Sequence, residues 1–209
     1  MAEQTPRRGL LVDWGGVLTT NVFESFQAFC VDEGLRPERV RDAFMNDPLA
    51  RELLADFECG RLENADFERQ FGAVLEVGEP EGLIERLFGR MRGDHVMQDA
   101  VIAFKAAGVK TGLLSNSWGA DTYDRRRFEQ LFDVLVISGE EGVRKPAPEI
   151  YATAAERMGL AAAELVFVDD LKGNLKPARA LGMATVHHED AAATIAQLEE
   201  LLGVAVPAA

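Results

Sequence analysis

The most informative segment of the sequence is Gly9-Leu10-Leu11-Val12-Asp13-Trp14-Gly15-Gly16. A short apolar run ends here at a carboxylate, and two glycines follow shortly after. Such a run without polar alternation is typical of a strand that is buried on both faces of a parallel sheet. Ligands of open α/β sheets bind beyond the carboxyl ends of the strands, so Asp13 is a candidate functional residue.

Four further apolar runs alternate with helix-period stretches. The complete set of predicted strands is Gly9–Asp13, Lys110–Ser115, Val134–Ser138, Leu165–Asp169 and Ala184–His187. Glycines follow several of the helical stretches, as helix C-caps require: Gly108, Gly159, Gly182 and Gly203. Pro148 and Pro177 fall where the first turn of a helix would accept a proline. These patterns predict the α/β class, with a parallel sheet between layers of helices.

The stretch between the first two strands has a different character, because it contains no convincing strand. It is predicted to form five amphipathic helices: Val22–Glu33, Pro37–Met45, Leu49–Phe57, Ala65–Val77 and Pro80–Met91. We therefore expect a core domain made of residues 1–19 and 94–209. Residues 20–93 are expected to form an inserted, all-helical cap domain.

Charge and cysteine content narrow the classes of function. The formal net charge of −13 over 209 residues disfavours nucleic acids and anionic membranes as partners. The cationic run Arg125–Arg127 is predicted to be a salt-bridged helix face. Cys30 and Cys59 have no metal-ligand or redox spacing, and no signal or membrane-spanning segment is evident, so we expect a cytoplasmic protein.

Polar residues stand at or just after the ends of four predicted strands. The first strand ends in Asp13, the second in Ser115-Asn116 and the fourth in Asp169-Asp170, while Lys145 follows the third after a short turn. Crowded carboxylates repel one another unless a cation or a proton intervenes. Mg²⁺ prefers a few carboxylate or carbonyl oxygens together with water and phosphate, so Mg²⁺ is the expected cofactor.

The same residues suit phosphoryl transfer through a carboxylate nucleophile. A lysine can keep the nucleophile ionised and stabilise the group in transfer. The hydroxyl of Ser115 and the amide of Asn116 can hydrogen-bond phosphoryl oxygens. A small phosphorylated molecule is therefore the expected substrate.

Four motifs in this order resemble those of the haloacid dehalogenase (HAD) superfamily. Asp13–Thr19 resembles the first motif, Leu113–Ser117 the second and Lys145-Pro146 the third. The segment Phe167–Asp170, together with Asn174, resembles the fourth. Residues 113–183 are especially similar to the phosphatase domain of soluble epoxide hydrolase, one branch of this superfamily. The resemblance implies a Rossmann-like core with a helical cap inserted after the first motif.

The resemblance also implies a role for each motif residue. Asp13 would be the nucleophile and a metal ligand, and Lys145 would bridge it to the phosphoryl group. The other implied metal ligands are the backbone carbonyl of Gly15, the carboxylate of Asp170 and, through water, that of Asp169. The other implied phosphate-binding residues are Ser115, Asn116 and Asn174.

Gly15 departs from the family pattern, which usually has a second aspartate at this position. That aspartate acts as general acid and then as general base, a contribution worth about 10²- to 10⁴-fold in rate. The preferred interpretation is a Mg²⁺-dependent phosphatase acting through an aspartyl phosphate. A non-catalytic HAD-fold binding protein and a 2-haloacid dehalogenase are the alternatives.

Three further residues are candidates for the substrate entrance. Trp14 and Trp118 each stand beside a motif residue, and packing in the core is an equally good interpretation of both. Arg61 belongs to the turn Glu58-Cys59-Gly60-Arg61 of the predicted cap. This turn is either an ordinary loop between helices or a segment that reaches over the site.

Overall fold

The computed structural model describes residues 6–119, 123 and 125–207. Its centre is a five-stranded, fully parallel sheet in the order β3-β2-β1-β4-β5. The strands are β1 (Gly9–Val12), β2 (Lys110–Ser115), β3 (Val134–Ile137), β4 (Leu165–Asp169) and β5 (Ala184–His187). The predicted α/β class and parallel sheet are confirmed. Two of the strands end one residue earlier than predicted, so that Asp13 and Ser138 lie just beyond the sheet.

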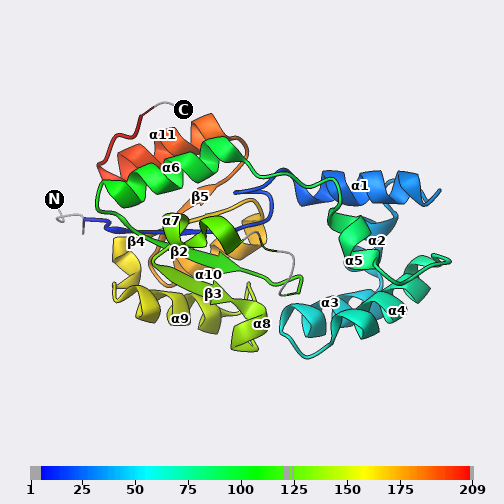
Figure 1. Cartoon of the computed structure of the whole chain (residues 1–209). Coiled ribbons are helices and arrows are strands. Elements are labelled where there is room, and N and C mark those ends of the chain that lie inside the picture. Colours follow the sequence, from blue (N-terminus) through cyan, green and yellow to red (C-terminus); the bar gives the residue numbers. More distant parts are fainter. Residues whose placement is uncertain (1–5, 120–122, 124, 208–209) are drawn as a thin grey trace.

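Helices cover both faces of the sheet (Figure 1). One face packs against α6 (His95–Ala106), α7 (Phe128–Leu131) and α11 (Ala191–Leu202), and the other against α9 (Pro148–Met158) and α10 (Lys172–Ala180). The side chains of β1 alternate between the two layers, since Leu10 and Val12 join the first and Leu11 joins the second. Burial on both faces explains why the strand sequences are continuously apolar.

The helix boundaries follow the capping residues with one exception. Gly108, Gly159, Gly182 and Gly203 all have positive φ, as the predicted C-caps require. Pro148 opens α9, as predicted. The prediction for Pro177 was wrong, because α10 begins at Lys172 and places this proline in the helix interior. The apolar residue Leu171 caps α10 without a side-chain hydrogen bond, so the sequence lacks the usual marker of its start.

Five helices between β1 and α6 form a second lobe, on the right of Figure 1. They are α1 (Val22–Asp32), α2 (Arg39–Asn46), α3 (Pro48–Glu58), α4 (Asn64–Leu75) and α5 (Leu83–Phe88). The lobe has its own hydrophobic cluster, in which Phe67 and Phe71 are completely buried. The helix α5 is shorter than predicted, because Gly82 takes a left-handed conformation at its N-cap. The division into residues 20–93 and the remainder stays our proposal for the domain boundaries.

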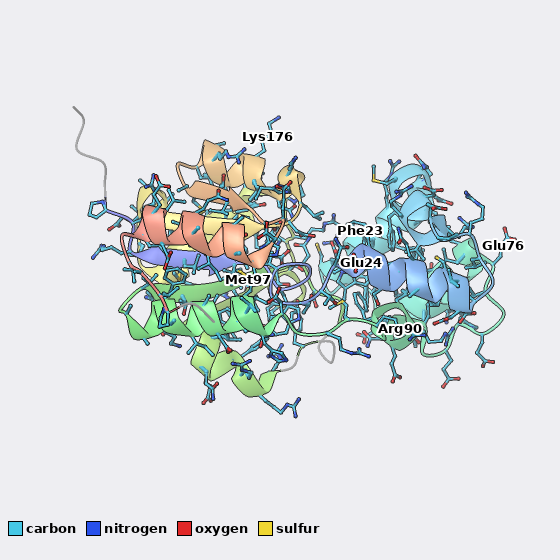
Figure 2. All side chains as sticks on the ribbon, turned by 90° about the horizontal axis from the view of Figure 1, so that it is seen from above. Phe23, Glu24, Glu76, Arg90, Met97 and Lys176 are labelled. Carbon is cyan, nitrogen blue, oxygen red and sulfur yellow. The ribbon has the colours of Figure 1, made fainter. Side chains whose placement is uncertain are left out.

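Two connections join the lobes and lie side by side. Thr19 and Gly93 form an isolated antiparallel bridge. Next to it, the backbone N–H of Thr20 donates to the carbonyl of Arg92 at 2.8 Å. Figure 2 shows Phe23 at this junction and Glu76 at the far end of the helical lobe.

The turn after α3 forms a second contact between the lobes. A Cβ on Gly60, which has positive φ, would lie 2.4 Å from the carbonyl oxygen of Gly139, so the two backbones meet without room for a side chain. The hydroxyl of Ser138 donates to the carbonyl of Glu58 and accepts from the backbone N–H of Ser117. Ser138 begins the short helix α8 (Ser138–Glu141), so this turn is held directly beside the carboxyl edge of the sheet.

The cationic run Arg125–Arg127 lies at the surface of the protein. Arg125 and Arg127 pair with Glu140 and Asp99, respectively, so both are salt-bridged as predicted, although this run is a 3₁₀ turn rather than an α-helix. No helix in the described part of the chain is both long and apolar enough to cross a bilayer.

Candidate active site

The functional candidates converge because of the strand order. The strand order reverses between β1 and β4, because β2 and β3 are added on one side of β1 and β4 and β5 on the other; such sheets form a crevice at this position. Asp13 directly follows β1, and Asp169 is the last residue of β4. The backbone N–H of Asp13 donates to the carbonyl of Val168 at 3.0 Å, which fixes the two carboxylates next to each other.

Lys145 lies between these two carboxylates. Its Nζ is 2.9 Å from Asp13 Oδ1 and 2.7 Å from Asp169 Oδ2, and its side chain is only 1% exposed. Burial alone would lower the pKa of Lys145, but the charges of Asp13 and Asp169 raise it above its ordinary value. The lysine is therefore a fixed positive charge at the centre of the site.

Asp169 is completely buried, and both of its oxygens are occupied. The side-chain amide of Asn174 donates to Oδ1 and Oδ2 at 3.0 Å each, and the backbone N–H of Leu171 donates to Oδ1 at 2.8 Å. With Lys145 also bound, this carboxylate acts in the structure as an anchor for the lysine. Asn174, which sequence reasoning placed near the phosphate, anchors Asp169 in turn.

Three carboxylates form a group that suits a divalent cation. Asp13, Asp169 and Asp170 each offer an oxygen, and these atoms lie within 4.8 Å of one another. Burial raises the pKa of Asp13 to about 8; Lys145 opposes this rise, and the charges of Asp169 and Asp170 add to it. Burial also raises the pKa of Asp170, to about 6, with Asp169 as the next cause. A bound cation would relieve this repulsion, so the donor set fits Mg²⁺.

Gly16 explains how Asp170 can approach the first strand so closely. Its φ is +76°, and a Cβ at this position would lie 2.5 Å from Oδ2 of Asp170. Gly16 therefore leaves room for the carboxylate of Asp170, and it can adopt the left-handed backbone conformation that this turn requires. Gly15 lines the same cavity as Asp13 and Asp170.

Ser115 and Asn116 lie beside the carboxylates, at the end of β2. The hydroxyl of Ser115 accepts a hydrogen bond from Tyr123 at 3.0 Å. The side-chain amide of Asn116 donates to Glu58 at 3.2 Å and to the backbone carbonyl of Lys145 at 3.1 Å. Its oxygen accepts from the backbone N–H of Lys145 at 2.8 Å. The Asn116 side chain is thus fully engaged in holding the Lys145 segment and the cap turn.

A cavity of about 310 Å³ opens from these residues towards the helical lobe. Nine of the predicted site residues line it: Asp13, Trp14, Gly15, Ser115, Asn116, Trp118, Lys145, Asp170 and Asn174. Asp169 does not line it. Trp14 also packs against Phe128, at 5.2 Å between ring centroids, so it is both core and wall. Arg61 does not line the cavity; its guanidinium binds Asp56 at 2.8 Å and donates to the carbonyl of Gly142 at 3.3 Å.

Sequence reasoning missed three charged residues that line this cavity: Glu58, Arg144 and Arg41. Arg144 Nη1 lies 2.7 Å from Glu58 Oε2, and the Glu58 side chain is 6% exposed. Burial raises the pKa of Glu58 to about 7, against the opposing charges of Arg144 and Lys145. The sequence singled out this turn but named Arg61 rather than Glu58, the last residue of α3, which lines the cavity.

The chain is similar to a family of hydrolases over most of its length and to individual proteins over all or part of it. A model of the haloacid dehalogenase-like hydrolases matches residues 8–182. The sesquiterpene phosphatase astK of Aspergillus oryzae is 31% identical over 207 residues, which cover 95% of this chain and 98% of that protein. The bifunctional epoxide hydrolase 2 of Rattus norvegicus is 36% identical over 121 residues, covering 54% of this chain but only 22% of that protein.

Solved structures share the fold. A HAD family enzyme from Bacteroides thetaiotaomicron matches with a TM-score of 0.70 and 22% identity, covering 88% of this chain and 95% of that one. The same enzyme in complex with magnesium and inorganic phosphate matches with a TM-score of 0.66, 22% identity, and coverage of 88% and 94%. At this level of identity the likeness shows the fold alone.

The role of Gly16 can be tested with Gly16→Ala against Gly34→Ala. Both glycines have positive φ, but a Cβ at Gly34 meets nothing within 4 Å, so only the Gly16 variant pushes on Asp170. We expect Gly16→Ala to weaken Mg²⁺ binding at least about tenfold, the lower range for disturbed ligand supports. Isothermal titration calorimetry measures this affinity. Equal Mg²⁺ affinities in the two variants would contradict the proposed role of Asp170.

The burial of Glu58 predicts a pH-dependent stability. The folded-state pKa of Glu58 is about 7, against an ordinary value of 4.5 for a solvated glutamate, so the folded state binds the proton more tightly. The wild type should therefore lose stability relative to Glu58→Gln as the pH rises through this window, by on the order of 3 kcal/mol in total. Below and above the window the difference should be constant.

Urea unfolding of the metal-free protein at several pH values measures this difference. Glu52→Gln, at an exposed position of the same helix, is the matched control for the loss of a carboxylate. A stability difference between wild type and Glu58→Gln that stays constant through the window would show that the Glu58 carboxyl is not held in a buried environment.

Proposed function

The chain belongs to the haloacid dehalogenase-like hydrolase family, and we propose that it is a Mg²⁺-dependent phosphatase that works through an aspartyl phosphate on Asp13. The observation that carries the proposal is the contact of Lys145 with both Asp13 and Asp169, beside Asp170 and inside a cavity. A buried lysine between two carboxylates favours the ionised form of the nucleophile against the effect of burial, and it presents positive charge to an incoming phosphoryl group.

The proposed reaction has two steps. In the first, a carboxylate oxygen of Asp13 attacks phosphorus, the bond from phosphorus to the ester oxygen breaks, and the leaving oxygen takes a proton from water to depart as the alcohol. In the second, water attacks the phosphorus of the aspartyl phosphate, releasing inorganic phosphate and regenerating Asp13. Lys145 neutralises charge at the reacting oxygens in both steps, while Asp169 and Asn174 hold the lysine in place.

Mg²⁺ would be held by the carboxylates of Asp13 and Asp170 and the carbonyl of Gly15, while Asp169, whose oxygens already accept from Lys145, Asn174 and Leu171, would act by holding the lysine. When bound, it would supply electrostatic stabilisation of the phosphoryl oxygens. Ser115 and the backbone of Asn116 are proposed to contact the same oxygens. The side chain of Asn116 would keep its structural bonds to Lys145.

The relatives support a phosphatase. Besides the sesquiterpene phosphatase, a phosphoglycolate phosphatase of Escherichia coli is 28% identical over 72% of this chain. The charges of the site support a phosphorylated small molecule rather than a 2-haloacid, because three grouped carboxylates suit a cation and a phosphate.

Gly15 is the feature that favours the alternative of a non-catalytic binding protein. It leaves the position of the usual second aspartate without a proton donor or acceptor. The same site would then bind Mg²⁺ and a phosphorylated ligand without turnover. The two candidates make opposite predictions for phosphate release.

The central prediction is that phosphate release depends on Asp13 and on Mg²⁺. Wild type should hydrolyse p-nitrophenyl phosphate when Mg²⁺ is present, and Asp13→Asn should reduce the rate to background because an amide is not a nucleophile here. Removal of Mg²⁺ with a chelator should abolish activity, and added Mg²⁺ should restore it. Asp99→Asn, an exposed aspartate of α6, is the matched control. Mg²⁺ binding without phosphate release from a broad panel of esters would favour the binding protein.

The consequence of Gly15 can be tested by restoring the carboxylate. Gly15 lies outside the positive-φ region, and a Cβ there would meet only Val22 Cγ2, at 3.0 Å, so a side chain needs only a small shift. Gly15→Asp should raise kcat/KM for ethyl phosphate at least about tenfold, because the ethoxide leaving group needs a proton. Gly15→Asn, of the same shape, should not.

p-Nitrophenyl phosphate provides the internal reference for this experiment. Its leaving group departs without a proton, so Gly15→Asp should raise its kcat/KM less than that of ethyl phosphate. If the aspartate and asparagine variants change both substrates by the same factors, proton transfer is not what position 15 lacks.

A further inference from the structure

The cavity has two chemically different halves. The half next to the sheet contains the carboxylates, Lys145 and the polar ends of the strands. The half towards the helical lobe is lined mainly by apolar side chains: Val22, Phe26, Phe44, Leu54, Phe88 and Met91. A ligand that fills the whole cavity therefore needs a phosphate at one end and an apolar group at the other.

Trp118 forms part of the apolar wall of the cavity. It comes from the core lobe, just after β2, but its ring lies among the aromatic residues of the helical lobe. Its ring centroid is 4.9 Å from that of Phe88, 5.7 Å from Phe26 and 5.8 Å from Phe44, in tilted or edge-on contacts. These three phenylalanines also line the cavity, so its apolar wall is built of packed rings that have little freedom to rearrange.

The cations of the cavity already have partners. Lys145 is held by Asp13 and Asp169, and Arg144 by Glu58. Arg41 is the remaining lining cation among the described residues; its side chain is 54% exposed and lies 3.5 Å from Asp42. A second anionic group on the substrate, such as a carboxylate, would thus meet no buried cation that is available to it.

The mouth of the cavity also carries apolar side chains. Met45 and Leu171 both line the cavity, and both are among the most exposed large apolar side chains of the described chain, at 66% and 43%. Exposed apolar side chains at the mouth of a pocket would be covered by an apolar ligand that extends outward.

We propose that the substrates are phosphate monoesters of apolar alcohols, with the hydrocarbon group lying between α1, α2 and α5 and against Trp118. This assignment rests on the proposed phosphatase function and adds the class of alcohol. The apolar wall selects by burial of hydrocarbon, while the paired cations offer nothing to a second charged group. Binding of the hydrocarbon also places the ester phosphorus against Asp13.

The test is a chain-length series with purified protein and Mg²⁺. Ethyl, butyl, hexyl and octyl phosphate are compared by kcat/KM, with phosphoglycolate as the small substrate that carries a carboxylate besides its phosphate, and p-nitrophenyl phosphate as the reference. Each buried methylene contributes roughly fourfold at full burial, so octyl phosphate should exceed ethyl phosphate at least about tenfold. Phosphoglycolate should be no better than ethyl phosphate.

A pair of variants locates the hydrocarbon. Met45→Glu places a charge on the cavity rim, whereas Leu49→Glu places the same charge at a position that is 51% exposed and outside the cavity lining. Met45→Glu should lower the octyl-to-ethyl ratio of kcat/KM at least about threefold, because charge next to hydrocarbon costs binding. Leu49→Glu should leave this ratio unchanged. Both side chains are exposed, so neither change disturbs the packed interior.

The outcomes separate this inference from the proposed function. Hydrolysis of p-nitrophenyl phosphate with a flat or falling alkyl series, or with phosphoglycolate as the better substrate, would overturn the substrate class and leave the phosphatase intact. Equal effects of Met45→Glu and Leu49→Glu on the ratio would overturn the placement of the hydrocarbon. Failure of every ester, including p-nitrophenyl phosphate, would overturn the phosphatase function and the substrate class with it.

Discussion

The ion contacts of Lys145 are the interaction on which the rest of the site depends. A lysine that is 1% exposed is tolerated because Asp13 and Asp169 both contact its ammonium group. Removal of one partner from a buried charge group costs several kcal/mol, about 3–5 in comparable cases. The bonds from Asn174 and Leu171 to Asp169, and from Asn116 to the Lys145 backbone, therefore hold the nucleophile and its cation in register.

Much of the fold follows from the sequence for a simple reason. Strands that are buried on both faces must be apolar throughout, and glycine is strongly favoured at left-handed helix ends, so the strands and C-caps could be predicted within a residue. The helix boundaries that were predicted wrongly are not marked by such residues in the sequence. Leu171 caps α10 without a side-chain bond, which hid the true place of Pro177, and Gly82 shortened α5 through a backbone angle that the hydrophobic pattern does not encode.

One part of the site could also be predicted from the sequence, and another part could not. Its centre could be predicted because strand order brings the ends of β1, β2 and β4 together. The cap side could not, because it depends on how two lobes meet. Glu58 precedes the turn in which Gly60 lies against Gly139, and Trp118 enters the aromatic cluster of the other lobe from a loop beside the active site. Such contacts between distant segments leave no periodic pattern in the chain.

The proposed mechanism requires Asp13 to form a covalent aspartyl phosphate. Borohydride reduces an acyl phosphate to an alcohol, which would convert this aspartate to homoserine, and peptide mass spectrometry can locate the change. Protein quenched during turnover and then reduced should carry homoserine at position 13, and protein treated without substrate should not. Phosphate release with an unmodified Asp13 under the same conditions, or homoserine at another aspartate, would contradict the assignment of the nucleophile.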